Sequence, residues 1–513
     1  MRDGESGSGL SALRGVASVV AGLGAGELVA GLVPPHASPV AAVAGSLVDL
    51  APGWAKELGI QLLGGWDKLA IILLVAIVVA GLGAVAGLLE SRRAPLGTAL
   101  VAALGLVGLL AAVLRGGSWV AAVPGLVGAA VAILVFRLLV VRARTEEDAG
   151  TSRATGGGLD RRAFLSWAGG LTAGGALAAL GGTAMSGLLR AGSAAAAVVR
   201  LPGPRRPAPP IPAGAELGVP GLAPVVTPVA DFYRVDTAFI VPRLSPADWR
   251  LRIHGRVDRE LELGWDELAA LDFEEFDVTL MCVSNPVGGP LTGNARWLGT
   301  RLRPLIEEAG PHPDADMALS RSVDGWTAST PLEVLREPDR AAILAVAMNG
   351  EPLTPEHGAP VRMVVPGLYG YVSATKWVVD IELTRFDEQS AYWTRNGWAP
   401  RGPVKLQSRI DVPRGGRLTA GPTAIAGVAW HQHVGVAGVE VRVDGGPWRA
   451  AELAEAIGVD TWVQWRLDWD AAPGEHRIEV RAIGADGEVQ TEELRDVVPD
   501  GATGHHRVIV QVA

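Results

Sequence analysis

One cysteine, Cys282, is the residue of this 513-residue chain best suited to bind a metal. It lies in the run Leu280-Met281-Cys282-Val283-Ser284-Asn285-Pro286-Val287-Gly288-Gly289, where an apolar stretch meets Asn, Pro and Gly residues. Because these residues favour turns, we expect the sulfur to lie at the end of a strand. A thiolate is a soft metal ligand, but one cysteine cannot complete an all-protein zinc site. A metal at Cys282 therefore needs a cofactor to supply ligands, and the alternative is a small buried side chain.

A second cluster of candidate residues lies between 346 and 380. Arg362 and Lys376 flank a turn rich in Gly and Pro, an arrangement able to bind a phosphate through charge and backbone N–H groups. The alternative is a pair of exposed cations on ordinary strands. The cluster contains the strings Met348-Asn349-Gly350-Glu351-Pro352-Leu353, His357-Gly358-Ala359-Pro360-Val361-Arg362 and Thr375-Lys376-Trp377.

Together these strings resemble the molybdopterin-binding domain of the sulfite oxidase family over about residues 227–390. The resemblance includes the Cys282 loop and the stretch Ala295-Arg296-Trp297-Leu298-Gly299-Thr300-Arg301-Leu302. It continues into the family's C-terminal dimerisation domain at Gly427-Val428-Ala429-Trp430, Val443-Asp444-Gly445-Gly446, Trp465-Arg466-Leu467 and His506-Arg507-Val508. Because separate matches occur in the same order as in the family, membership is favoured over a merely buried cysteine and over a pair of exposed cations.

The resemblance implies a molybdenum–molybdopterin cofactor, with Cys282 as the protein ligand and the pyranopterin dithiolene among the other ligands. His357 and Arg362 would hold the pterin and its phosphate, and Thr375 and Lys376 would close over it. The segment 232–236 matches the family's N-terminal cofactor-contacting strand, in which Arg234 would face the anionic substrate. The implied cofactor-binding residues are Tyr233, Arg234, Asp236, Cys282, Ser284, Asn285, His357, Arg362, Ala374, Thr375 and Lys376, of which Cys282 and Arg234 are also catalytic.

The implied activity is oxygen-atom transfer on a small oxyanion or sulfur compound, as in the sulfite oxidases. One departure weakens sulfite as the substrate: Val346 and Ala347 stand where these enzymes carry a tyrosine and then a glutamate. A phenol donor is absent unless Tyr369 or Tyr371 reaches the site. The alternatives are a periplasmic-type sulfoxide reductase and a catalytically silent, membrane-tethered binding protein.

The elements that position this chemistry follow a membrane region, which we place at residues 1–190. Apolar runs near 10–33, 67–90, 95–115, 118–141 and 164–187 approach the length of about 20 residues that a spanning helix needs. Residues 160–165 read Asp-Arg-Arg-Ala-Phe-Leu and resemble a twin-arginine export signal. The alternative for this motif is an ordinary charged flank before the fifth span.

Loop charges predict the orientation of these spans. Arginines gather in the loops at 91–94 and 143–163, whereas the loops at 34–66 and 115–118 carry few positive charges. The positive-inside rule places the arginine-rich loops in the cytoplasm. The chain after the fifth span would then be extracytoplasmic, anchored in the cell membrane as a multi-pass protein.

Three segments are expected after the membrane region. Residues 191–226 are rich in proline and predict a stiff, extended spacer. Residues 227–403 predict a mixed α+β domain, with strands at 248–256 and 276–281 and short helices at 265–271 and 302–309. Residues 404–513 predict an immunoglobulin-like β-sandwich, with strands at 439–443, 462–469, 476–481 and 507–512.

The remaining histidines and the net charge of the chain indicate which metals, electron partners and nucleic acids to expect. His431 and His433 on one strand face, or His505 and His506, were candidates for a second metal, with substrate-pocket lining as the alternative for 431–433. The only histidine before residue 200 is His36, so membrane b-haem is not expected and the electron partner would be a separate protein or a quinone. Net charge is −9 with no basic run, which argues against nucleic acid. The resemblance suggests a homodimer through the C-terminal domain.

Overall fold

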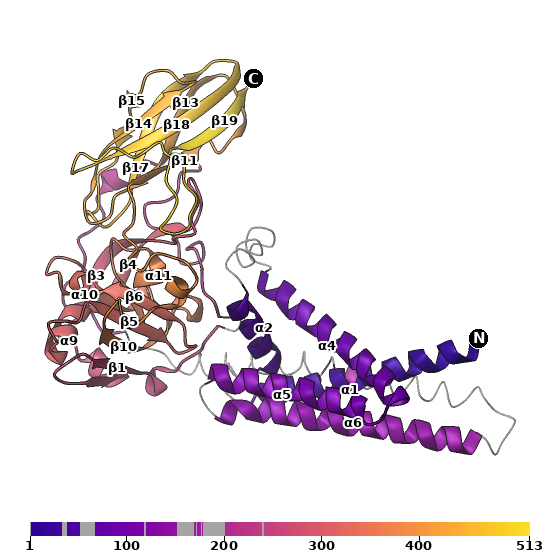
Figure 1. Ribbon diagram of the computed structural model, residues 1–513. Helices are drawn as coiled ribbons and strands as arrows, with labels where there is room; N and C mark the ends of the chain where they lie inside the picture. The colour runs from indigo at the N-terminus through magenta and orange to yellow at the C-terminus, as the bar shows by residue number, and fades with distance from the viewer. Residues whose placement is uncertain are drawn as a thin grey trace. The chain divides into compact units, whose positions relative to one another are not determined.

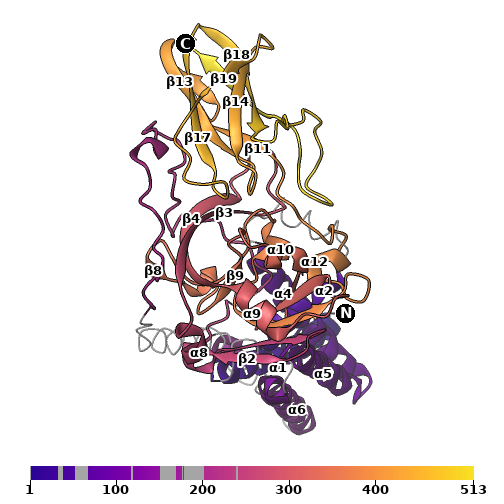
Figure 2. The ribbon, with the colours of Figure 1, turned by 90° about the vertical axis from the view of Figure 1, so that its left-hand side faces the viewer.

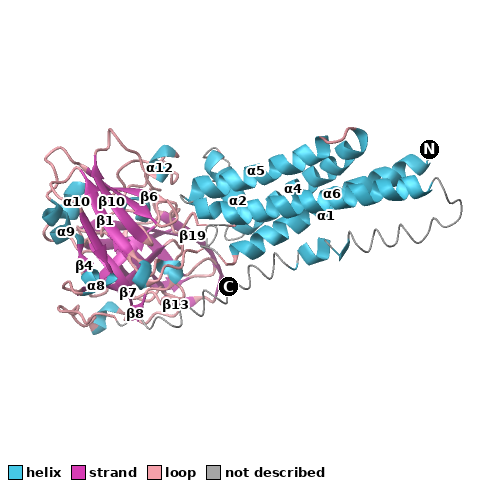
Figure 3. Ribbon diagram, turned by 90° about the horizontal axis from the view of Figure 1, so that it is seen from below, coloured by secondary structure: helices cyan, strands magenta, loops and turns pink. Residues whose placement is uncertain are grey.

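The computed structural model describes residues 2–32, 38–51, 67–116, 119–150, 169–170, 172–175, 177, 201–238 and 241–513. The chain forms two compact units (Figure 1). The helical unit comprises Met1–Val198 with Ala238–Arg243, and the strand-rich unit comprises Val199–Thr237 with Leu244–Ala513. Figure 3 shows this division by secondary structure, with the long helices in the first unit and the described strands, together with short helices, in the second.

Four helices of the helical unit are long and apolar enough to cross a membrane, over Ser8–Ala30, Ala70–Arg92, Leu96–Leu114 and Trp119–Arg142. These agree with four of the five predicted spans. The fifth, near 164–187, lies mostly outside the described residues, and the twin-arginine-like motif at 160–165 lies wholly outside them. The helices are α1 (Arg2–Ala30), α2 (Pro39–Leu50), α4 (Asp67–Arg92), α5 (Leu96–Gly116), η3 (Trp119–Ala121) and α6 (Ala122–Gly150).

The short helix α2 was not expected, because its segment was interpreted as a loop. Ser38 caps it by accepting a hydrogen bond from the backbone N–H of Ala41 (3.1 Å), and Pro39 occupies its first turn. Glu27 of α1 accepts hydrogen bonds from the Ser38 hydroxyl (2.8 Å) and the Val40 backbone (3.2 Å). A polar residue of the first span therefore fixes the start of α2.

Glycines allow the long helices to approach one another closely. A Cβ atom on Gly15 of α1 would collide with the carbonyl oxygen of Gly83 in α4, and one on Gly87 would collide with that of Ser11. On another part of α1, a Cβ on Gly22 would lie 2.6 Å from the carbonyl oxygen of Gly128 in α6. Small residues at such crossings are typical of helix packing in membranes, where backbone proximity replaces the hydrophobic effect.

Large apolar side chains cover the outward surface of α4. In water such a surface would be unfavourable, whereas in lipid it is the expected one. These exposed side chains are Leu73, Leu74, Ile77, Val78, Leu82 and Val85.

The mixed part of the strand-rich unit contains two five-stranded sheets. The first has the order β2-β1-β10-β5-β6, with β1 and β10 parallel, and the second has the order β3-β4-β7-β8 with β9 added against β7. Figure 2 shows β3 and β4 running side by side. The strands are β1 (Arg250–Gly255), β2 (Leu261–Gly264), β3 (Glu274–Met281), β4 (Thr292–Arg301), β5 (Met317–Ser322), β6 (Thr327–Pro331), β7 (Ile343–Met348), β8 (Glu351–Pro352), β9 (Arg362–Val364) and β10 (Val378–Thr384).

Short helices cover these sheets. In α9, Leu302, Leu305, Ile306 and Ala309 are buried at the spacing of one helical face, and Gly310 ends the helix with a positive φ of 69°. The predicted helix over 302–309 is thereby confirmed. The others are η5 (Pro246–Asp248), α8 (Trp265–Ala269), α10 (Leu332–Arg336), η6 (Pro355–His357), α11 (Gly370–Ser373) and α12 (Tyr392–Arg395).

The C-terminal part consists of two sheets, β11-β13-β17-β16 and β12-β19-β18-β14-β15, which enclose one apolar core. Asp444 and Gly445 both have positive φ, 53° and 69°, which the Asp-Gly-Gly sequence after the predicted strand 439–443 favours as a tight turn. The strands are β11 (Gln407–Val412), β12 (Gly416–Leu418), β13 (Gly421–Trp430), β14 (Val436–Val443), β15 (Arg449–Ala450), β16 (Glu452–Leu453), β17 (Val463–Ala471), β18 (Gly474–Gly484) and β19 (His506–Val512). We call residues 404–513 the sandwich.

The proline-rich segment at 201–226 is extended, but it is bound to the folded unit along its length. Its backbone pairs with β3, where Arg205 N donates to Phe273 O (2.7 Å) and Glu275 N donates to Arg206 O (3.0 Å). Further along, Leu217 N donates to the side chain of Gln464 in the sandwich (2.7 Å). The sequence predicts a stiff, extended spacer at 191–226, and residues 201–226 are in addition bound to the folded unit, because proline content sets stiffness but not whether a surface binds the chain.

Candidate active site

Cys282 directly follows β3, at the strand end that the sequence predicted. Its N–H donates to Leu291 O (2.9 Å) and its carbonyl accepts from Asn285 N (3.1 Å). The Asn285 side chain closes the loop by accepting a hydrogen bond from Leu291 N (2.7 Å). The loop thus holds the sulfur in a fixed position beside the end of β3.

The Cys282 thiol is buried, with 8% of the residue exposed. Burial raises its pKa, and hydrogen bonds from the backbone and side chain of Ser284 offset part of that rise because they favour the thiolate. Without a cation or metal the sulfur therefore stays protonated at neutral pH. A metal ion at the sulfur would reverse this preference.

Arg362, at the start of β9, is a buried cation without a carboxylate partner among the described residues. Its guanidinium donates to three backbone carbonyls, those of His357 (3.2 Å), Met363 (3.4 Å) and Ala374 (3.5 Å). It also lies 5.0 Å from the centre of the Trp297 ring. Burial lowers the pKa of Arg362 to about 10. A buried charge of this kind is suited to an anionic ligand, such as the phosphate of a pterin cofactor.

Lys376 is a second buried cation, in the loop between α11 and β10. Its Nζ donates to Asp236 (2.8 Å) and to the carbonyl of Glu356 (3.0 Å), and lies 4.6 Å from the Trp377 ring. Burial lowers the pKa of Lys376 to about 8, although Asp236 opposes the change. The ammonium is therefore charged at neutral pH, and Asp236 and the Glu356 carbonyl hold it in position.

His357 and Thr375 complete this side of the site. His357 Nε2 donates to Val229 O (3.1 Å), which fixes the tautomer, and burial followed by the charge of Arg362 lowers the pKa of its ring. Thr375 is fully buried and its hydroxyl shares a hydrogen bond with Ser320 (2.6 Å). The imidazole is therefore neutral at pH 7.

Tyr233 links the cysteine side to the cation side. Burial raises the pKa of its hydroxyl, the charge that Cys282 can carry raises it further, and Arg362 lowers it. A Cβ on Gly370 would lie 3.7 Å from both the Tyr233 hydroxyl and the carbonyl oxygen of Met281. The segment before β1, the Cys282 loop, β9 and the α11–β10 loop therefore converge on one place.

The residues that converge here include most of those that the sequence predicted for the site. Two features differ from the prediction. Residues 232–236 are irregular, not the strand that was predicted. Arg234 has a side chain that is 42% exposed, pairs with Asp236 (3.2 Å) and acts on the charge of Lys376. It is therefore the more exposed of the two cations that pair with Asp236, and its role toward substrate stays a prediction.

Sequence reasoning assigned no role at the site to Trp297, Arg409 and His506, because each arrives from a distant part of the chain. Trp297 contacts Arg362. Tyr369, which the sequence named as a possible phenol donor, is fully buried, and this burial raises the pKa of its hydroxyl. Arg409 donates to Gly289 O in the Cys282 loop (3.1 Å) while pairing with Asp411, and the ring of His506 packs on Gly288. Trp297 and His506 fall within the family strings, which was the only signal available.

The histidine pairs are not joint chelators. β13 ends at Trp430, and His433 adopts a positive φ of 64°, so His431 and His433 do not share a strand face. His433 lies near Asp460 (3.3 Å) and Glu337 (3.5 Å). His505 is hydrogen-bonded at both nitrogens, to Glu479 (2.9 Å) and Gln490 (3.0 Å).

Residues 238–393 match the family described as "Oxidoreductase molybdopterin binding domain". The chain is 37% identical over 155 residues to the oxidoreductase YuiH of Bacillus subtilis, covering 30% of this chain and 74% of that protein. The chain belongs to the sulfite oxidase family of molybdopterin-dependent oxidoreductases. The family assignment implies a molybdenum cofactor, and the buried thiol and unpaired buried guanidinium fit one.

Two further proteins are similar to this member of the sulfite oxidase family over more than half of its length. Mouse mitochondrial sulfite oxidase is 30% identical over 330 residues, covering 53% of this chain and 59% of that protein. The chain therefore spans less than two thirds of that enzyme's length. The sulfane dehydrogenase SoxCD of Paracoccus pantotrophus is 23% identical with a TM-score of 0.48, covering 56% of this chain and 83% of that one.

Proposed function

We propose that this oxidoreductase transfers an oxygen atom to or from a small oxyanion or sulfur compound, at a molybdenum–pterin centre bound through Cys282. One observation carries the proposal: the buried cation Arg362, without a carboxylate partner in the described chain, and the buried Cys282 thiol both lie near enough to the half-buried Tyr233 for their charges to act on its hydroxyl. Burying such a charge costs free energy unless an anion pairs with it. A phosphate-bearing cofactor that also reaches the sulfur satisfies both groups.

Each residue would contribute one contact to the bound cofactor. Cys282 supplies the thiolate ligand, and Ser284 stabilises that thiolate by hydrogen bonds. Arg362 and Lys376 pair with anionic oxygens, while the neutral His357 and the Thr375 hydroxyl supply hydrogen bonds. When bound, the cofactor supplies two-electron oxygen-atom chemistry, and the protein orients it and excludes water.

The substrate pocket would differ from that of a sulfite oxidase. Val346 and Ala347 are buried in β7, so they offer no phenol or carboxylate. Tyr371 donates its hydroxyl to Ala399 O (2.8 Å), whereas the buried Tyr369 hydroxyl has no hydrogen-bond partner among the described residues. Tyr369 is therefore the phenol that we assign to the pocket. Because the usual donor is missing, reduction of a sulfoxide is retained as the second candidate.

The surroundings of the site lead to three further proposals. The first is that the strand-rich unit is extracytoplasmic, which the arginine-rich loops support through the positive-inside rule. The sandwich is assigned an immunoglobulin-like topology and a homodimer contact from the family strings. Electrons pass to a separate protein or a quinone, since the sequence has no histidine pair for a membrane haem.

Metal analysis and a substrate panel test the function. Full-length protein from a host that makes the cofactor should hold close to one molybdenum per chain and turn over sulfite, methionine sulfoxide or nitrate with redox dyes. Cys282→Ser should abolish turnover, whereas His312→Gln, at an exposed His–Asp contact, should not change it. A folded protein without molybdenum would instead identify a catalytically silent, membrane-tethered protein.

A further inference from the structure

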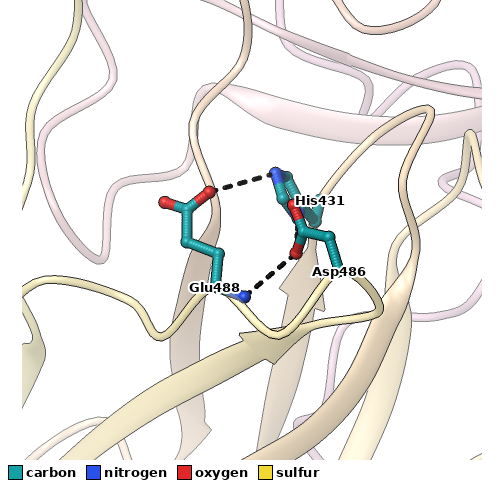
Figure 4. A group of neighbouring side chains, drawn as sticks. All are labelled: His431, Asp486 and Glu488. Atoms are coloured by element: carbon teal, nitrogen blue, oxygen red, sulfur yellow. Dashed lines mark hydrogen bonds and ion pairs between the residues drawn. The ribbon is translucent and has the colours of Figure 1, made fainter.

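Three metal-ligating side chains meet at one edge of the sandwich, away from Cys282. His431 follows β13, and Asp486 and Glu488 lie in the turn after β18 (Figure 4). His431 Nδ1 lies 3.9 Å from an Asp486 oxygen, and Nε2 lies 3.8 Å from a Glu488 oxygen. One potential ligand atom from each residue lies within 4.8 Å of the other two.

The imidazole of His431 is buried without a hydrogen bond that would explain its position. The residue is 8% exposed, and its Nδ1 has no hydrogen-bond partner in the described chain. His505, another histidine of the sandwich, is about as buried, yet both of its nitrogens are hydrogen-bonded. Because a buried ring nitrogen without a partner costs free energy, His431 indicates a missing ligand at this edge.

Gly484 preserves the space between these groups. A Cβ atom there would lie 2.5 Å from Asp486 Oδ1 and 2.6 Å from His431 Nδ1. The backbone at Gly484 does not have a positive φ, so its conformation does not require glycine. The absent side chain instead leaves room between a carboxylate and an imidazole.

We propose that His431, Asp486 and Glu488 bind one divalent transition-metal ion, represented by Zn²⁺, through one imidazole nitrogen and two carboxylate oxygens. Zinc bonds of about 2.0–2.2 Å place neighbouring ligand atoms about 3.4 Å apart. The Glu488 oxygen lies on the Nε2 side of the ring, and because its side chain is 57% exposed it can turn toward an ion that Asp486 shares with the imidazole. The nitrogen ligand favours zinc over Ca²⁺ and Mg²⁺, which prefer oxygen.

The bound ion would fasten the sandwich edge that contacts the catalytic part. Ala485 N already donates to Gly435 O (3.0 Å), which joins the two segments that carry the ligands. Gln432, beside His431, donates through its amide to the carbonyl of Thr279 in β3, the strand that leads to Cys282. The ion therefore has a structural role at this contact, with a fourth position for water.

Zinc titration of the full chain in detergent, with a competing chromophoric chelator, tests the site. Cys282→Ser is the parent protein, so that the thiol cannot bind zinc. After EDTA treatment it should bind one Zn²⁺ per chain, and Zn²⁺ should raise its thermal midpoint. Asp486→Asn, Glu488→Gln and Gly484→Ala should each weaken binding by more than about tenfold.

The matched control is Asp468→Asn, which removes the charge of an exposed carboxylate paired with Arg466 in the same domain. It should bind zinc as the parent does. Absence of saturable zinc binding in the folded parent would overturn the proposal. So would equal affinities in Asp468→Asn and Asp486→Asn, or a midpoint that Zn²⁺ raises equally in both.

Discussion

Replacing Arg362 by methionine should have opposite effects on the cofactor-free and the cofactor-loaded protein. Because burial lowers the pKa of Arg362 to about 10, the charged form costs stability at every pH below that value, including pH 7. At about 1.36 kcal/mol for each pKa unit, the cost is about 3 kcal/mol. An anion that pairs with the guanidinium removes this cost. The affinity of the anion for the site should therefore be higher by up to about two orders of magnitude.

The cofactor-free variant should therefore be more stable than the parent. Methionine removes the charge and its cost. It also removes three long hydrogen bonds and the Trp297 contact, and their loss lowers the free energy of unfolding by about 2 kcal/mol. The expected net change is a gain of about 1 kcal/mol in the free energy of unfolding. Molybdenum per folded chain should fall well below that of the parent.

Thermal unfolding of cofactor-free protein and metal analysis of loaded protein measure the two effects. The matched control is Arg442→Met, because Arg442 pairs with the buried carboxylate of Glu479 (2.8 Å) in the sandwich. It should lose stability and keep its molybdenum. Full molybdenum content in Arg362→Met, or a loss of stability as large as that of Arg442→Met, would refute the reasoning.

Three further outcomes follow. Burial lowers the pKa of Lys376 from 10.5 to about 8, so the charged ammonium destabilises the fold fully below pH 8 and no longer above pH 10.5. Between these pH values the free energy of unfolding of the cofactor-free parent should therefore rise by about 3 kcal/mol relative to that of Lys376→Met. Thermal midpoints of the two proteins that change in parallel with pH would contradict this. Gly15→Leu should lower the thermal midpoint in detergent by the equivalent of about 1–3 kcal/mol, because a backbone carbonyl of α4 occupies the space, whereas Gly81→Leu has open space and should not. Gly288→Ala should lower molybdenum content, because its φ of 76° and the ring of His506 leave no room for a Cβ, and unchanged content would show that the Cys282 loop adapts.

Local patterns predicted the elements well. The helix at 302–309 follows from apolar residues at one helical face and a glycine at its end, and the turn after 443 follows from Asp-Gly-Gly. The strand before Cys282 and the loop after it were predicted for the same reason. Each depends on residues within a few positions of one another, so the sequence contains the whole signal.

Long-range placements were not predictable in the same way. Arg409 and His506 reach the Cys282 loop from the sandwich, across more than a hundred residues. The joint site of His431 with Asp486 and Glu488 depends on two strand ends meeting, whereas the sequence drew attention to His431 with His433. No periodicity records such contacts, and only the family strings indicated that some of these positions matter.

The bound segment at 201–226 decides where a soluble form of this enzyme should begin. Its Glu216 accepts a hydrogen bond from Gln464 (2.8 Å), and its Val225 carbonyl accepts from the indole of the buried Trp462 (3.0 Å). A protein cut at residue 227, where the family resemblance starts, would leave those buried donors without acceptors. Crystallisation trials and secreted expression should therefore start from residue 201.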